Sequence, residues 1–327
     1  MPVVSSTYSP PPLLSGGHRQ TLYASLVRRV DFDYDRSERI DTPDGDFLDL
    51  DWATARTTSR PQTNGGRVAV LTHGLEGSTD RRYMRGMTRA LTRRGWDVCA
   101  WNLRGCSGEL NRRVATYHSG KTDDLARVVD HVLDHGYDTA ALVGFSLGGN
   151  LTLKYLGERG ADVDDRIWGA VAISVPVDLK ASSHQIGRTS NWHYTQYFLR
   201  SLQDTIRQKA ERHPTGVRTD ALDHIRTLRD FDDAYTAPLN GFRDADTYYR
   251  EASSKPLLSA LSVPTLLINA ANDPFLAPSC YPTAIAEGHP HLTLEVPSSG
   301  GHVGFVTFSD TGTYWSERRA ASFLATA

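Results

Sequence analysis

The sequence has few cysteines and no long hydrophobic run, and these absences exclude several classes of protein. Its three cysteines, Cys99, Cys106 and Cys280, are too few and too irregularly spaced for a disulfide framework or a zinc site. No stretch approaches the ~20 apolar residues of a transmembrane helix. The N-terminus also lacks the basic start and apolar stretch of a signal peptide. We therefore expect a soluble, cytoplasmic protein with no integral membrane segment and no bound metal.

The chain also lacks an excess of charge of either sign. Its 327 residues include 38 acidic and 36 basic side chains, a formal net charge of −2. The arginines of residues 81–94 are spaced like one face of a helix, which favours a solvated helix over the alternative of a basic binding patch. Nucleic acid is therefore not an expected partner.

Short apolar runs dominate the chain after residue 65. They predict strands at 67–72, 96–101, 139–145, 168–174, 264–270 and 292–296. Segments of helical period separate most of them, at 81–94, 122–135 and 149–159. Apolar strands that alternate with helices indicate an α/β fold, with a mostly parallel central sheet and helices on both faces.

Two different patterns precede these runs. Residues 1–17, rich in proline, serine and glycine, are expected to lie extended over the domain without forming an element. Two alternating runs then flank Pro43-Asp44-Gly45, which predicts an antiparallel hairpin.

The alternation of strands and helices stops between residues 180 and 262. Apolar side chains recur at helical spacing from Trp192 to Ile206 and from Leu222 to Phe231, with no strand-like run between them. We expect a helical cap insertion over 180–262, and a core of residues 1–179 and 263–327. The cap would cover the carboxyl ends of the strands, where open α/β sheets bind ligands. An ordinary helical decoration is the alternative.

The segment Gly144-Phe145-Ser146-Leu147-Gly148 matches the pattern G-x-S-x-G. The match is weak alone, but a strand-like run precedes it and a helix-forming stretch follows, which is the setting of a nucleophile elbow. The glycines leave room for the tight turn, in which the serine backbone is strained. Ser146 is therefore the candidate nucleophile, and a bystander serine in a glycine-rich turn is the alternative.

A serine nucleophile needs a base, and the base needs an orienting acid. His302 follows the last expected strand in a glycine-rich, mobile loop and is the candidate base. Asp273 follows the strand at 264–270 and can accept the Nδ1–H of the histidine. Asp178, which follows the strand at 168–174, is the rival acid.

The developing oxyanion needs two N–H donors. The amide of Leu147, directly after the nucleophile, is one candidate. Leu75, in the loop after the strand at 67–72, is the other. His73 in the same loop is expected to brace it through hydrogen bonds rather than to react.

Aromatic side chains gather near the start of the expected cap. We expect Trp192 and Phe198, together with Tyr194 and Tyr197, to contribute to an apolar acyl pocket above Ser146. The alternative is that they form the cap's own small core.

Several longer strings carry a family resemblance. They are GGHRQTLY at 16–23, LTHGLEGS at 71–78, NLRGCSGELNR at 102–112, GFSLGGN at 144–150, NAANDPF at 269–275 and SSGGHVGF at 298–305. On these strings nearly the whole chain resembles the YheT-like branch of the α/β-hydrolase superfamily, which is related to mammalian ABHD-type lipases and esterases. The resemblance implies the α/β-hydrolase fold and assigns Ser146, Asp273 and His302 as nucleophile, acid and base. It also implies a carboxylesterase for short- to medium-chain acyl esters, with no cofactor.

Three functions stay open at this point. The first is a serine esterase that hydrolyses a small-molecule acyl ester through an acyl-enzyme. The second is a thioesterase or amidase with the same triad, and the third is a catalytically silent binding protein on a hydrolase fold. Dehalogenases and epoxide hydrolases usually carry aspartate at the elbow, so Ser146 argues against both. The sequence gives no oligomeric state.

Overall fold

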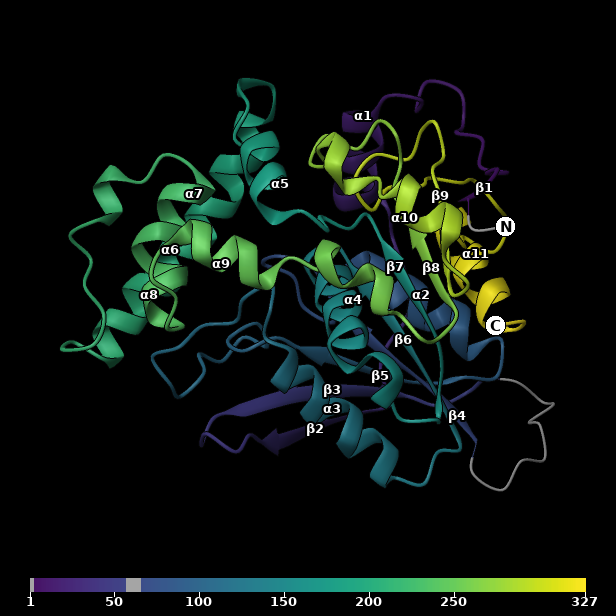
Figure 1. The fold of residues 1–327 in the computed structure, drawn as a ribbon, viewed down its shortest axis with the longest axis horizontal. Coiled ribbons are helices and arrows are strands. Elements are labelled where there is room, and N and C mark those ends of the chain that lie inside the picture. Colours follow the sequence, from purple (N-terminus) through teal and green to yellow (C-terminus); the bar gives the residue numbers. More distant parts are fainter. Residues whose placement is uncertain (1–2, 57–65) are drawn as a thin grey trace.

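A mostly parallel sheet forms the centre of the fold (Figure 1). The structure is a computed structural model and describes residues 3–56 and 66–327. Within these residues the sheet has nine strands in the order β1-β9-β8-β7-β6-β4-β5-β3-β2. β3 runs antiparallel to both of its neighbours, and every other neighbouring pair is parallel. The predicted α/β fold with a mostly parallel sheet is confirmed.

The central strands coincide with the apolar runs of the sequence to within two residues at each end. They are β4 (Arg67–Thr72), β5 (Asp97–Asn102), β6 (Thr139–Phe145), β7 (Ile167–Ile173), β8 (Thr265–Ile268) and β9 (Leu292–Glu295). Nearly all of their residues are buried, as expected for strands covered on both faces.

The predicted hairpin is also present. β2 (Arg36–Asp41) and β3 (Phe47–Ala53) pair in an antiparallel register that places Asp41 opposite Phe47. Gly45 in the turn has a φ of +82°, a conformation that glycine adopts without strain. The hairpin forms one edge of the sheet, and β2 is the outermost strand there among the described residues.

The expectation for residues 1–17 is wrong at one point. Val3 and Val4 form a short strand, β1 (Val3–Val4), which pairs in parallel with β9 at the other edge of the sheet. Two β-branched residues suit an extended edge position, and β9 offers its unpaired backbone groups there. The chain then continues into α1 (Gly17–Leu22) and the π-helical turn η1 (Tyr23–Val27).

Helices cover both faces of the sheet, as predicted (Figure 1). On one face lie α2 (Arg82–Thr92) and α11 (Trp315–Leu324), which bury Met84, Met87 and Trp315 among others. On the other face lie α3 (Thr122–Asp134), α4 (Leu147–Arg159) and α10 (Thr283–Gly288). Two short 3-10 turns, η2 (Gly160–Asp162) and η7 (Pro278–Cys280), complete these connections.

Between β7 and β8 the structure holds helices and loops, which we call the helical insertion (residues 174–264), seen at the left of Figure 1. Its elements are α5 (Leu179–Ile186), η3 (Thr189–Asn191), α6 (Trp192–Arg212), η4 (Leu222–His224), α7 (Leu228–Phe231), η5 (Asp232–Thr236), α8 (Ala237–Leu239), α9 (Ala245–Ala252) and η6 (Lys255–Ala260). The segment 222–231 has helical spacing but forms two short turns, because Thr227 starts a new helix with a capping box to Asp230.

No helix in residues 3–56 and 66–327 combines the length and the apolar character needed to cross a bilayer.

Candidate active site

Ser146 lies at the sharp turn between β6 and α4. Its backbone has φ +52° and ψ −119°, a conformation that is costly for a residue with a side chain. A Cβ on Gly144 would lie 2.3 Å from the carbonyl oxygen of Gly148, and a Cβ on Gly148 would lie 2.4 Å from that of Thr72. Only glycine fits at either position, so the G-x-S-x-G pattern is a packing requirement of this turn.

His302 and Asp273 form a hydrogen-bonded row with Ser146. The Oγ of Ser146 lies 2.9 Å from Nε2 of His302, and Nδ1 of His302 lies 2.8 Å and 3.1 Å from the two carboxylate oxygens of Asp273. The carboxylate is fully buried and also accepts a hydrogen bond from the Phe275 amide, at 2.9 Å. A carboxylate at Nδ1 favours the tautomer whose Nε2 can accept a proton from the serine.

The N-terminal helix α1 packs against the loop that carries His302. Thr21 Oγ1 accepts a hydrogen bond from the His302 backbone N–H at 2.8 Å. A Cβ on Gly301 would lie 2.3 Å from the Gly17 carbonyl oxygen, and a Cβ on Gly17 would lie 2.0 Å from that of Asn272. These glycines therefore allow three backbone segments to meet next to the imidazole.

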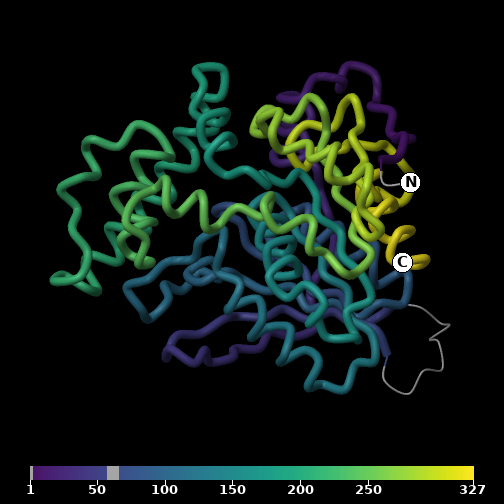
Figure 2. The backbone as a smooth tube through the Cα atoms, in the orientation of Figure 1, coloured from purple at the N-terminus to yellow at the C-terminus, as the bar shows by residue number. Residues whose placement is uncertain are grey.

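Gln20, one residue earlier on the same helix, ties α1 to the flanks of that loop. Its Nε2 donates to Ser299 Oγ at 2.7 Å, and its Oε1 accepts from the Tyr8 hydroxyl at 2.6 Å and from the Val306 amide at 3.1 Å. Figure 2 shows the N-terminal segment in purple beside the yellow C-terminal segment that it holds. We call Gln20 and Thr21, with their partners, the α1 clamp.

The loop after β4 passes directly over Ser146. A Cβ on Gly74 would lie 3.1 Å from the Ser146 Cβ and 3.6 Å from its Oγ. Within the described part of the chain, the amides of Leu75 and Leu147 have no hydrogen-bond acceptor. Leu147 is the first residue of α4, where a helix leaves its N–H groups unpaired. Each of these two amides therefore keeps an N–H group that is available to an oxygen acceptor.

His73 braces this loop, as the sequence predicts. Its Nε2 accepts a hydrogen bond from the Leu103 amide at 3.1 Å, so Nδ1 carries the proton that is donated to the Gly74 carbonyl oxygen at 2.8 Å. Complete burial lowers the pKa of His73 to about 4, so the ring is neutral at physiological pH.

A cavity of about 360 Å³ lies beside Ser146, between the sheet and the helical insertion. Its apolar lining includes Leu75, Leu147, Ile186, Leu202, Ile206 and Phe231. Two charged side chains in the wall, Lys209 and Asp232, are hydrogen-bonded to uncharged groups of the protein. Lys209 Nζ lies 2.7 Å from both Asn111 Oδ1 and the Arg113 carbonyl oxygen, and burial lowers the pKa of Lys209 to about 8. Asp232 accepts from the Tyr249 hydroxyl at 2.6 Å, and burial raises the pKa of Asp232 to about 6.

The structure does not bring every predicted residue to Ser146. Asp178 instead caps α5, accepting from the Ala181 amide at 3.1 Å, so Asp273 and not Asp178 contacts His302. Trp192 is 63% exposed, and neither Trp192 nor Phe198 belongs to the lining of the cavity.

The physical reason lies in the direction of α6. Its cavity-facing side carries Leu202 and Ile206, whereas Phe198 packs on the insertion's own core and Tyr194 stacks on His18.

No role was predicted from the sequence for the residues of the α1 clamp or for Asp232. Gln20 and Thr21 lie in the string GGHRQTLY, which indicates the family. The string does not indicate which residues these two side chains contact. Asp232 lies in an acidic stretch that resembles any solvated helix end. Its contact with Tyr249 depends on two segments of the insertion meeting, which local spacing does not encode.

Comparison with known proteins identifies the family of the chain. A family model described as the alpha/beta hydrolase fold matches residues 68–309. The chain is 34% identical over 332 residues to YheT of Escherichia coli (strain K12), which is named as a provisional esterase; the match covers 98% of this chain and 94% of that protein. It is 30% identical over 310 residues to human phospholipase ABHD3, with coverage of 93% and 75%.

Solved structures show the same fold at lower identity. The Pyrococcus furiosus esterase Pf2001 superposes with a TM-score of 0.57 at 16% identity, covering 91% of this chain and 97% of that chain. The family match and the two relatives show that the chain belongs to the α/β-hydrolase family, in its YheT and ABHD-type branch, and that it is a hydrolase.

Proposed function

We propose that this hydrolase is a serine esterase that cleaves small-molecule esters of short- to medium-chain acids. The observation that carries the proposal is the unbroken row from Ser146 Oγ through His302 to the buried Asp273 carboxylate, with contacts of 2.9 Å and 2.8 Å. In this proposal Ser146 is the nucleophile, His302 the base and Asp273 the orienting acid. The reaction uses these side chains and water.

The proposed chemistry has two halves. Ser146 Oγ attacks the ester carbonyl carbon while its proton passes to His302 Nε2. The bond to the alcohol oxygen then breaks, and the alcohol takes the proton from His302 as it leaves. Water then attacks the acyl-enzyme and gives a proton to His302. The bond between the acyl carbon and Ser146 Oγ breaks, Oγ takes the proton back from His302, and the carboxylic acid is released. The N–H groups of Leu75 and Leu147 are proposed to stabilise the negative oxygen of both tetrahedral intermediates.

The cavity supports the proposed size of the acyl group. Its volume of about 360 Å³ lies near the lower end of the ~300–1,000 Å³ typical of small-molecule sites. Leu202, Ile206 and Phe231 line it from the helical insertion. We therefore propose that residues 180–262 act as a cap that shapes the acyl pocket, and that residues 1–179 and 263–327 form the catalytic core.

The names of the relatives support the ester as the bond that is cleaved. The Escherichia coli relative is named as an esterase and the human relative as a phospholipase, and both names denote enzymes that cleave esters. No observation in the cavity favours a thioester or an amide over an ester.

Labelling with a fluorophosphonate and a panel of substrates test the proposal together. Each acyl group is offered as an ester, a thioester and an amide. We expect wild-type protein to be labelled and to cleave the ester fastest. Ser146→Ala should not be labelled and should lose about 10⁴- to 10⁶-fold in turnover.

Ser183→Ala is the matched control, because Ser183 is another serine of the same cavity. It should still be labelled. A Ser146→Ala protein that keeps more than a tenth of wild-type activity would refute the proposed nucleophile. Wild-type protein that takes no label would favour the silent binding protein instead.

A further inference from the structure

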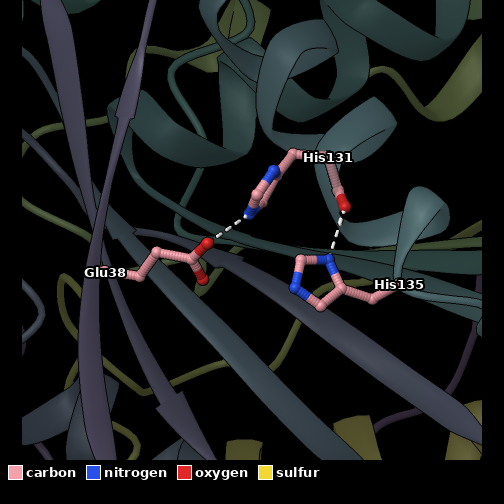
Figure 3. Close-up of side chains that lie close together, drawn as sticks. All are labelled: Glu38, His131 and His135. Carbon is pink, nitrogen blue, oxygen red and sulfur yellow. Dashed lines mark hydrogen bonds and ion pairs between the residues drawn. The ribbon is translucent and has the colours of Figure 1, made fainter.

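Three potential metal-binding side chains meet at the β2 edge of the sheet. Glu38 projects from β2, and His131 and His135 project from α3 (Figure 3). The histidines are four residues apart, so they share one face of the helix. His131 Nε2 lies 2.9 Å from Glu38 Oε1, and one possible ligand atom from each of the three side chains lies within 4.8 Å of the others.

We propose that Glu38, His131 and His135 form a binding site for a divalent transition metal, and their ligand chemistry favours Zn²⁺. Two imidazoles and one carboxylate are a ligand set that Zn²⁺ uses, with bonds of about 2.0–2.2 Å. Ligand atoms around a tetrahedral ion are then about 3.4 Å apart. Because the three ligand atoms already lie within 4.8 Å of one another, each distance has to shorten by at most about 1.4 Å.

The surroundings of His135 and Glu38 orient these two side chains as ligands are oriented in metal sites. His131 donates its Nε2–H to Glu38 Oε1, so metal binding at Nε2 requires this proton to move to Nδ1. Nδ1 of His135 lies 2.8 Å from the His131 carbonyl oxygen, which can only accept, so Nδ1 donates and Nε2 keeps its lone pair free. Glu38 Oε2 accepts from Trp52 Nε1 at 2.9 Å and from Arg36 at 2.7 Å. Such outer contacts fix the tautomer of a ligating histidine and the direction of a ligating carboxylate.

The cluster is open to solvent on one side. The side chains of His131 and Glu38 are 17% and 25% exposed, and His135 is exposed. An ion can therefore enter, and water would complete its coordination as in other three-ligand zinc sites. Arg36 beside Glu38 and Arg127 on α3 place positive charge near the site and weaken its hold on a dication. We expect moderate affinity, not a permanently loaded site.

Occupancy would join two elements that are far apart in the sequence. The Glu38–His131 contact spans 93 residues and connects the edge strand β2 to α3. A ligand that binds the folded state and not the unfolded chain stabilises the fold by an amount that grows with the logarithm of its concentration over its dissociation constant. Zn²⁺ should therefore raise the melting temperature of the protein.

The test is a titration of tag-free, chelator-treated protein with Zn²⁺, followed by calorimetry and thermal unfolding. We expect one Zn²⁺ per chain at this site and a rise in melting temperature. His135→Ala should bind at least about tenfold more weakly and lose the thermal shift. His135 is exposed, so this variant is expected to fold. His131→Gln and Glu38→Gln should behave in the same way.

His224→Ala is the matched control, because His224 is an exposed histidine of the helical insertion outside the cluster. It should bind Zn²⁺ as wild type does. If wild-type protein binds no Zn²⁺, the cluster is an ion pair and the proposal is refuted. Equal binding by wild type and His135→Ala would refute it as well, because the ion would then sit elsewhere.

Discussion

The carboxylate of Asp273 contacts His302 and one backbone amide, so its proposed part in the reaction is to orient an imidazole. A change at this residue should therefore alter catalysis much more than stability. Asp178 is the residue to compare with Asp273. The sequence analysis gives it as the alternative acid, but its side chain caps α5.

Asp273→Asn is expected to lower turnover by roughly 10⁴-fold, with a melting temperature near that of wild type. The amide group can donate to Nδ1, which favours the tautomer whose Nε2 already carries a proton and cannot take one from Ser146. Asp178→Asn should keep most activity, because asparagine also caps helices. Steady-state kinetics on both variants decide the assignment: a large loss in Asp178→Asn alone would move the acid to residue 178.

His73 links the loop over Ser146 to the pH dependence of stability. Its folded-state pKa of about 4 is below the ~6.5 of an unfolded histidine. The stability it contributes is therefore fully present above pH ~6.5 and is lost as pH falls toward 4. At pH 5 the loss is about 2 kcal/mol of unfolding free energy, relative to pH 8.

Two measurements check this expectation. The free energy of unfolding in urea should fall between pH 8 and pH 5. The imidazole NMR signal of His73 should not shift over that range in the folded protein, whereas it should titrate near ~6.5 in the unfolded chain. A folded-state signal that moves above pH 6 would contradict the neutral, bracing role.

Among the elements, α1 is the one that holds the loop of His302. The hydrogen bonds of the α1 clamp reach the chain on both sides of His302. Thr21 donates to the Gly17 carbonyl oxygen and accepts from the His302 amide, so its hydroxyl joins the helix to the loop. In the proposed mechanism this makes Thr21 a positioning residue.

Thr21→Val is expected to lower kcat by about tenfold with little change in KM. It removes the hydroxyl that makes both hydrogen bonds, each worth about 0.5–1.5 kcal/mol, with little change in side-chain shape. Thr21→Ser keeps the hydroxyl and should restore kcat. Kinetics and thermal unfolding are measured together on both variants. A lower melting temperature with unchanged kcat would show that the threonine only stabilises the fold.

The contacts of α1 also differ from the rest of the fold in how far they could be predicted from the sequence. The central strands, the hairpin and the order of Ser146, Asp273 and His302 could be predicted, because apolar runs and local motifs mark them directly. β1 and the α1 clamp could not, since each depends on pairing across almost the whole chain, 281 residues for Thr21 and His302. The short turns at 222–231 were missed for a different reason: helical spacing of apolar residues does not show where a new cap restarts the helix.

For the whole molecule, the cavity lies where the helical insertion meets the sheet, so the insertion is expected to set substrate length. Leu202 on α6 lines the cavity, whereas Trp192 at the start of that helix is exposed. Substitutions at these two positions of one helix can therefore distinguish an effect on the pocket from an effect at the surface.

Leu202→Trp should shift the preferred acyl chain to shorter lengths, because the larger side chain occupies volume that the acyl chain would fill. Each methylene that no longer fits costs about 0.8 kcal/mol, or about fourfold in kcat/KM. Trp192→Ala should leave the chain-length profile unchanged. Chain-length profiles measured with esters from acetate to dodecanoate test both expectations. A change in the preferred chain length in Trp192→Ala alone would show that the aromatic side chains around Trp192 line the acyl pocket.

The pairing of the first strand with β9 also bears on how the protein is made. A ribosome delivers Val3, Val4 and α1 before their partners, β9 and the His302 loop. At about 5–20 residues per second, Thr21 waits roughly 15 to 55 s for His302. A nascent chain that contains Ser146 but not yet His302 therefore lacks the proposed base, and in the proposed mechanism the hydrolase can become active only after the His302 loop has been synthesised.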